Sequence, residues 1–181
     1  SFRDWLEAKN SKPYNSYGNG AAMRVSAVGF IATSLEEVKK LSRKVTEVTH
    51  NHPEGIKGAE ATAVAIYIAR TGSTIADIKD YIENHYYKLD FTLDEIRETY
   101  KFNETCQDTV PQAIKAFLES TSFEDAIRNA ISIGGDSDTI AAITGGIAEA
   151  FYGVPKELSD KALSYLDERL RAIFEEFVNN Y

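Results

Sequence analysis

Residues 134–148 read GGDSDTIAAITGGIA, and this stretch decides the fold. The acidic residues Asp136 and Asp138 come first, and a nearly uncharged segment then runs from residue 140 to residue 151. A helix with so little charge is apolar on most of its faces, which is typical of the centre of a protein core. The sequence therefore predicts a buried central helix over residues 140–151, entered through an acidic turn.

Helical signals also fill the chain on either side of this stretch. Ser34 and Glu37 are spaced as a capping box, and apolar residues follow at helical intervals as far as residue 48. Residues 58–70 are rich in Ala, Ile and Val, which predicts a helix buried on most sides, with Pro53 near its start. The remaining predicted helices are 74–82 after a Ser73 or Thr74 cap, a short or irregular one after the capping box at 92–95, 110–118, 122–131 and about 159–178.

Only one segment competes with an entirely helical interpretation. Residues 24–31 are the best candidate for a strand, and the pattern fits a helix equally well. No repeat, low-complexity tract or flexible linker divides the 181 residues, and this length is enough for one well-buried core. We therefore expect an all-α protein, a compact helical bundle formed as a single domain by residues 1–181.

The composition excludes several functional classes. Hydrophobic residues make up 43% of the chain, yet no apolar run approaches the ~20 residues that cross a bilayer, so no membrane partner is expected. The formal net charge of −8 disfavours binding to a nucleic-acid polymer, although cations and backbone N–H groups can still offset a ligand's phosphates locally. The single cysteine, Cys106, excludes an intrachain disulfide and a multi-cysteine metal site. A cytoplasmic protein is the simplest interpretation.

The acidic pair, Asp136 and Asp138, has two interpretations. The two residues can be a turn residue and a helix cap, and their spacing alone does not exclude this. Alternatively they hold a divalent cation, because two close carboxylates need more compensation than the roughly 0.3–1 kcal/mol that a helix N-terminus provides. Both carboxylates and the Thr139 hydroxyl are hard oxygen ligands of the kind that Mg²⁺ and Mn²⁺ prefer. Because the following helix has the composition of a central one, we favour the cation site.

A second polar stretch, NSYGNGAAMR, lies near the N-terminus. Its turn of Gly18, Asn19 and Gly20 can take positive φ and present successive N–H groups to an anion. Ser16 adds a hydroxyl group, and Tyr17 adds an aromatic face on which a ligand can stack. A plain turn entering a helix is the alternative, and we would prefer it if this stretch stood alone.

A third cluster, THNHPEG, contains the two histidines His50 and His52. Residues two apart do not share a helical face, and no cysteine or third histidine lies nearby, so a zinc site is not expected. We predict that one histidine contacts a ligand and that the other caps a helix. A structural role for both is the alternative.

Together and in this order, the three stretches resemble the ADP-ribosylglycohydrolase family, in particular its compact bacterial members. The matching blocks are residues 16–24, 49–55 and 134–139, and residues 106–113 also resemble the family. The resemblance covers essentially the whole chain. It implies an orthogonal all-α bundle with a two-metal site in a central cleft. The implied reaction is hydrolysis of the bond that joins ADP-ribose to a protein side chain or small acceptor.

The same resemblance implies a role for each candidate residue. Asp138 would bridge two Mg²⁺ or Mn²⁺ ions, and Asp136 and Thr139 would hold one of them, so the two aspartates are the predicted catalytic residues. The substrate-binding residues that it implies are Ser16, Tyr17, Gly18, Asn19, Gly20 and His50. The loop residues would surround the diphosphate and ribose, while the metals would polarise the ribose hydroxyls and the attacking water.

One departure from the family pattern lowers the expected activity. Residues 1–181 contain neither the early acidic helix nor the Thr-Asp-Asp-Thr motif, which in relatives complete the metal pair and supply a catalytic Glu. The chain also begins at Ser1 without an initiator Met, so we expect that an N-terminal segment was lost. The chain is then predicted to bind metal weakly, to turn over little substrate and to self-associate through an apolar groove left bare.

Two other functions remain open beside the hydrolase. The chain can be a binding module that recognises ADP-ribose without hydrolysing it, or a structural protein on the same scaffold, because a fold alone does not fix a function. For the hydrolase, the implied partner is an ADP-ribosylated protein or a small ADP-ribose conjugate.

Overall fold

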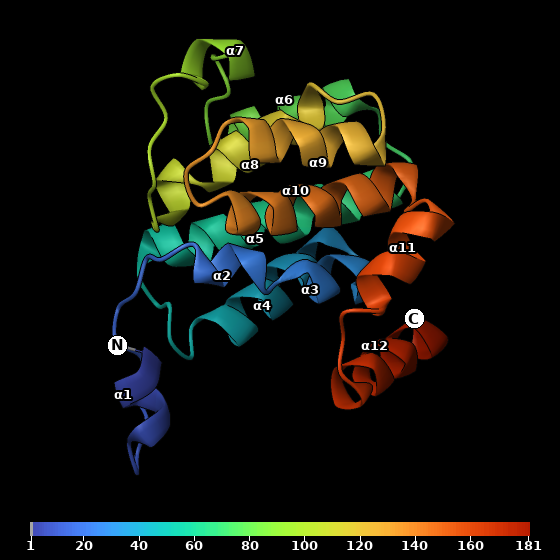
Figure 1. Ribbon diagram of the computed structural model, residues 1–181. Helices are drawn as coiled ribbons and strands as arrows, with labels where there is room; N and C mark the ends of the chain where they lie inside the picture. The colour runs from blue at the N-terminus through green and yellow to red at the C-terminus, as the bar shows by residue number, and fades with distance from the viewer. Residues whose placement is uncertain (1) are drawn as a thin grey trace.

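All the regular elements are helices in the computed structural model, which describes residues 2–181 (Figure 1). In chain order they are α1 (Phe2–Glu7), α2 (Gly20–Met23), α3 (Ser26–Ile31), α4 (Leu35–Thr46), α5 (Pro53–Arg70), α6 (Ile75–His85), α7 (Leu93–Ile96), the short 3₁₀ helix η1 (Cys106–Asp108), α8 (Val110–Leu118), α9 (Phe123–Ser132), α10 (Ser137–Tyr152), α11 (Lys156–Leu163) and α12 (Glu168–Asn180). Among these residues β pairing is limited to an isolated bridge between Gly18 and Thr105. The predicted all-α fold is confirmed.

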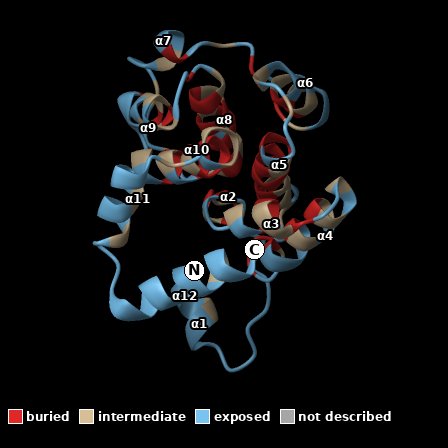
Figure 2. Cartoon of the chain, turned by 90° about the vertical axis from the view of Figure 1, so that its right-hand side faces the viewer, coloured by how far each residue is buried: buried red, intermediate tan, exposed pale blue. Residues whose placement is uncertain are grey.

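Two apolar helices, α5 and α10, pack against each other at the centre of the bundle (Figure 1). Helix α5 also contacts α2, α3, α4 and α6, whereas α10 also contacts α8 and α9. Buried residues are concentrated in α5, α8 and α10 (Figure 2). The central helix predicted over residues 140–151 is therefore α10, which begins three residues earlier, at Ser137.

Hydroxyl side chains start four of the helices, in agreement with the sequence signals. The N-cap residues Ser34, Thr74, Thr92 and Ser122 each accept a hydrogen bond from the backbone N–H three residues further on. The capping box predicted at residues 34–37 is only half formed, because the Glu37 carboxylate accepts hydrogen bonds from Thr33 and not from the Ser34 N–H. Thr33 donates through both its N–H and its hydroxyl, which explains why the Glu37 carboxylate bonds Thr33 and not Ser34.

The structure resolves an open prediction in one segment and corrects a prediction in another. The candidate strand at residues 24–31 forms α3 and is helical. The single helix predicted over about 159–178 is two helices, α11 and α12. The break occurs because Asp167 takes an extended conformation, with ψ 166°, and caps α12 by accepting a hydrogen bond of 2.8 Å from the Leu170 N–H.

Helices α1, α11 and α12 form the periphery of the molecule, and none of their described residues is buried (Figure 2). The apolar stripe of α12 faces solvent, with Leu170, Ile173 and Val178 each more than half exposed. Across residues 2–181, no helix combines the length and the apolar character needed to cross a membrane.

Candidate functional site

The acidic turn at residues 134–139 leads directly into α10. Gly134 and Gly135 both have positive φ, 71° and 68°, which residues with a side chain rarely adopt. Asp136 then occupies the N-cap position of α10, but its carboxylate makes no capping hydrogen bond. Asp138 lies inside the first turn of the helix. Among the described residues, neither carboxylate makes a capping hydrogen bond to α10.

Asn19 joins the acidic turn to the Gly-Asn-Gly turn. Its side-chain Nδ2 donates a hydrogen bond of 2.6 Å to Oδ2 of Asp136. The same nitrogen lies 3.1 Å from Oγ1 of Thr109 and 3.4 Å from the backbone carbonyl oxygen of Asn103. Asn19 is only 6% exposed, so these bonds form where an unpaired polar group would be costly. The structure thus brings two stretches that are far apart in sequence into one site.

The backbone of the Gly-Asn-Gly turn differs from the prediction. Asn19 has right-handed helical angles, with φ −64°, and neither glycine of the turn has positive φ. The Asn19 N–H donates to the Glu104 carbonyl at 2.7 Å, and the Gly18 N–H donates to the Ser16 hydroxyl at 3.2 Å. The predicted positive φ of the turn is therefore wrong, and the N–H groups of Gly18 and Asn19 bond within the protein.

The other predicted metal ligands lie next to Asp136 in the first turn of α10. Asp138 is exposed, and its carboxylate makes no hydrogen bond or ion pair with residues 2–181. Thr139 is buried, and its hydroxyl lies 3.5 Å from the sulfur of Met23, which is a weak acceptor. In the described part of the chain, no three or more His, Cys, Asp or Glu residues gather closely enough to hold a metal ion. The first turn of α10 and its N-cap thus offer two carboxylates and one hydroxyl as oxygen donors.

The two histidines of the third cluster take different positions. His50 is 6% exposed, and its Nδ1 lies in hydrogen-bond contact with the Thr49 hydroxyl at 2.7 Å. Its Nε2 faces the turn, since a Cβ added at Gly18 would lie 3.6 Å from it. His52 is the N-cap of α5, where its Nδ1 accepts a hydrogen bond of 3.1 Å from the Glu54 N–H. His52 is thus the capping histidine, and His50 is the one directed at the turn.

The buried position of His50 predicts a dependence of stability on pH. Burial, with a smaller contribution from the Arg24 guanidinium, lowers the pKa of His50 below its usual value. The unfolded chain therefore binds a proton at this ring at a higher pH than the folded protein does. The contribution of the neutral His50 ring to stability is complete above its unfolded-state pKa of about 6.5. That contribution is lost as the pH falls through the folded-state pKa.

We expect the free energy of unfolding to fall more steeply from about pH 7.5 to about pH 5 in the wild type than in a His50→Gln variant. Urea unfolding at a series of pH values measures both slopes. Equal slopes would show that His50 titrates normally in the folded protein.

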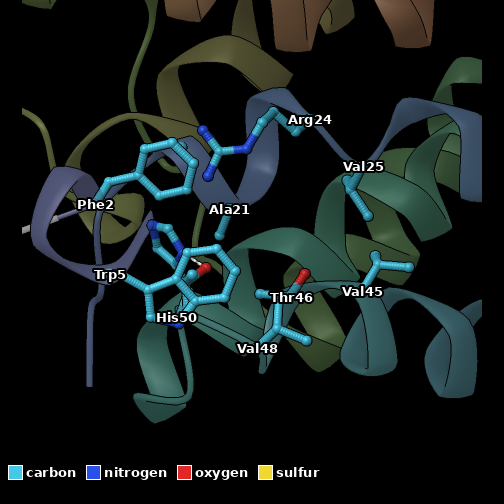
Figure 3. A pocket seen from close by; sticks show the side chains of 11 residues that line it. Phe2, Trp5, Ala21, Arg24, Val25, Val45, Thr46, Val48 and His50 are labelled. Carbon is cyan, nitrogen blue, oxygen red and sulfur yellow. Dashed lines mark hydrogen bonds between the residues drawn. The ribbon is translucent and has the colours of Figure 1, made fainter. Parts of the chain in front are cut away.

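A cavity of about 260 Å³ lies beside His50 (Figure 3). Phe2 and Trp5 from α1 line it together with His50, and Arg24 reaches over Phe2 with its guanidinium carbon 5.8 Å from the ring centroid. Gly20, which follows Asn19 directly, also lines the cavity. Asp136 and Asp138 do not line the cavity. The cavity therefore lies beside the acidic turn and is not formed by it.

Sequence reasoning gave no role to the segment that precedes α8. Its residues support the site: Thr109 bonds Asn19, and the Tyr100 hydroxyl donates to the Asp108 carbonyl at 2.7 Å while its ring lies against Gly135. The one signal in the sequence was the likeness of residues 106–113 to the family, which does not indicate what these residues do.

Cys106 also belongs to this supporting segment. It is buried, and its thiol donates to the Gly18 carbonyl at a sulfur–oxygen distance of 3.2 Å. Burial raises the pKa of Cys106 to about 12, so the thiol stays protonated near neutral pH. A protonated, buried thiol holds the turn in place and does not act as a nucleophile.

Comparison with known proteins gives a consistent result. A family model described as ADP-ribosylglycohydrolase matches residues 1–181, the whole chain. The chain also resembles a solved structure described as an ADP-ribosylglycohydrolase-related protein complex, with a TM-score of 0.72 and 21% sequence identity over 97% of this chain and 64% of that one. At that identity the structural likeness shows the shared fold.

The sequence relatives are also named as hydrolases of ADP-ribose conjugates. The chain is 27% identical over 185 residues to human ADP-ribosylhydrolase ARH3, an alignment that covers 77% of this chain and 51% of the relative. It is 29% identical over 148 residues to ADP-ribosylarginine hydrolase Tri1 of Pseudomonas putida strain GB-1, covering 76% and 39%. The chain thus spans about half the length of the curated ARH3 relatives that it matches.

Proposed function

Because this chain belongs to the ADP-ribosylglycohydrolase family, we propose that it binds ADP-ribose and carries the hydrolase machinery that removes it from a protein side chain or small acceptor. The observation that carries the proposal is the hydrogen bond from Asn19 to Asp136, because it places the Gly-Asn-Gly turn against the acidic pair. Relatives named ADP-ribosylhydrolase and ADP-ribosylarginine hydrolase support the reaction class. The substrate of this chain would be an ADP-ribosylated protein or a small ADP-ribose conjugate.

Mg²⁺ is the proposed cofactor, with Mn²⁺ as the alternative ion, and Asp136, Asp138 and Thr139 would hold it. Mg²⁺ is commonly bound through one or two carboxylates, while waters and ligand oxygens complete its coordination. The donors present fit this pattern: the Asp138 carboxylate has no partner in residues 2–181, and the Asp136 carboxylate accepts only the bond from Asn19. Mg²⁺ would act there as a Lewis acid on the ligand oxygens.

The side chains around the acidic pair have the chemistry to orient an ADP-ribose. The Asn19 Oδ1 accepts no hydrogen bond from the described residues, so it is available to a ribose hydroxyl. Tyr17 is 46% exposed and offers a ring on which a base can stack. His50 faces the turn with Nε2, and its Nδ1 contacts the Thr49 hydroxyl. In the tautomer in which Thr49 donates to Nδ1, Nε2 would donate to a ligand oxygen. Ser16, Gly18 and Gly20 would shape the turn around the diphosphate.

We propose further that residues 1–181 act as one domain with a weak metal site and little turnover. Only two carboxylates and one hydroxyl are available at the acidic turn, and no larger ligand group exists among residues 2–181. The exposed apolar face of α12 would favour self-association. Efficient hydrolysis of ADP-ribosylated arginine by this chain would contradict the expectation of little turnover.

Calorimetric titration with ADP-ribose tests the proposal. We expect measurable binding that is strengthened by Mg²⁺ and weakened again by EDTA, because the cation would bridge the acidic pair and the ligand's oxygens. The small ligand set favours one second candidate, a module that recognises ADP-ribose without hydrolysing it. Binding of equal strength with and without Mg²⁺ would support that module and contradict the metal-dependent hydrolase.

A further inference from the structure

Thr109 stands where a threonine hydroxyl normally caps a helix, yet it makes no capping bond. It is the N-cap residue of α8 and is fully buried. The other Ser and Thr residues at the start of long helices described above do cap them, as Thr74 and Ser122 show. Thr109 has ψ −46°, unlike the extended Thr74 and Ser122, so its hydroxyl is not placed to cap α8 and makes another contact.

That other contact is with Asn19. The Thr109 hydroxyl donates its one hydrogen to the Asn103 carbonyl at 3.2 Å. Its oxygen is then left as an acceptor, and the Asn19 Nδ2 lies 3.1 Å away and donates to it. The direction of this bond is fixed, because a hydroxyl has a single hydrogen and here the hydrogen is already engaged.

The fixed direction determines how the Asn19 amide is oriented. Three acceptors surround its Nδ2, namely the Asp136 carboxylate, the Thr109 hydroxyl oxygen and the Asn103 carbonyl. If the amide rotated by half a turn, its Oδ1 would face all three acceptors in a buried place, which is unfavourable. The hydroxyl therefore helps to keep an N–H directed at Asp136.

We infer that Thr109 is a positioning residue, which locks the Asn19 amide and through it holds the Asp136 carboxylate in place for a divalent cation. The cation half of this inference rests on the function proposed above, whereas the locking of the amide does not. A residue that contacts a metal ligand directly, as Asn19 contacts Asp136, typically changes metal affinity by about 10–100-fold when it is removed. Thr109 lies one contact further away, so its removal should change the affinity by less.

The test compares Thr109→Val, which keeps the shape and removes the hydroxyl, with Thr109→Ser, which keeps the hydroxyl. Thr144→Val is the matched control, because the Thr144 side chain is also fully buried and its hydroxyl donates to the Ala113 carbonyl at 2.8 Å. Two quantities are measured on the folded proteins. They are the Mn²⁺ affinity, from the electron paramagnetic resonance signal of free Mn²⁺, and the NMR signal and hydrogen-exchange rate of the Asn19 side-chain NH₂ group.

Thr109→Val is expected to weaken Mn²⁺ binding measurably but by less than about tenfold, and to shift the Asn19 NH₂ signal with faster exchange. Thr109→Ser and Thr144→Val are expected to keep both values close to those of the wild type. An Asn19 signal that is equally unchanged in Thr109→Val and Thr144→Val would overturn the inference. If the wild type binds no Mn²⁺, the metal part of the proposed function fails, and the Asn19 signal alone then decides the role of Thr109.

Discussion

An Asp136→Asn substitution is expected to weaken Mn²⁺ binding by at least about 100-fold while the protein stays folded. The substitution removes a charged oxygen ligand, which Mn²⁺ and Mg²⁺ require, but it keeps the size of the side chain. The new amide oxygen can still accept the hydrogen bond from Asn19. A neutral acceptor replaces a charged one, so the free energy of unfolding should fall by only about 1 kcal/mol. Mn²⁺ titration and urea unfolding measure the two effects.

Asp77→Asn is the matched control for this experiment. The Asp77 carboxylate also accepts a short hydrogen bond from a side chain, 2.6 Å from the Thr74 hydroxyl, and another of 2.9 Å from the Thr74 N–H, but it only caps α6. The Asp77→Asn substitution should lower stability slightly and leave Mn²⁺ affinity unchanged. If Asp136→Asn behaves like Asp77→Asn, with a loss of stability alone, the acidic pair is structural.

The second large effect is expected from Gly135→Ala, which should lower the free energy of unfolding by about 2–4 kcal/mol. The residue has φ 68°, which is strained for alanine. A Cβ there would also lie 2.4 Å from Cε1 and 3.0 Å from Cδ1 of Tyr100. That ring cannot move away freely, because the Tyr100 hydroxyl donates to the Asp108 carbonyl. The turn that holds Asp136 would be displaced as well.

Gly134→Ala separates the effect of backbone strain from the effect of contact with Tyr100. Gly134 has nearly the same φ, 71°, but a Cβ added there meets no atom within 4 Å. Its substitution should therefore lower stability only by the backbone strain, about 1 kcal/mol. Urea unfolding of both variants gives the comparison. Equal losses for Gly134→Ala and Gly135→Ala would mean that contact with Tyr100 contributes nothing.

Most of the longer helices could be predicted from the sequence because their signals are local. Caps such as Thr74 and Ser122 and the apolar run of α5 lie within the helices that they define. The C-terminal helix was predicted wrongly as a single one because the apolar spacing continues across the break. There a local hydrogen bond to Asp167 starts a new helix, and apolar periodicity does not reveal it.

The site could be predicted only in part, since its contacts join distant segments. The sequence singled out both Asp136 and Asn19, and the structure joins their side chains. The role of Thr109 was not predictable, since its position before Pro111 suggests an ordinary helix cap. Only the folded chain shows that its hydroxyl bonds Asn19 instead. The backbone angles of the Gly-Asn-Gly turn were likewise set by tertiary contacts, among them the bond to the Glu104 carbonyl.

The most direct test is to titrate ¹⁵N-labelled protein with substoichiometric Mn²⁺ and to observe which backbone amide signals broaden first. A divalent ion held by Asp136 and Asp138 should broaden the signals of residues 134–140 first, together with those of residues 18–20, because Asn19 bonds Asp136. The protein carries many other acidic residues, with Glu36 and Glu37 adjacent on the exposed start of α4. Broadening at such surface carboxylates, with the signals of 134–140 and 18–20 left sharp, would contradict the proposed cation site.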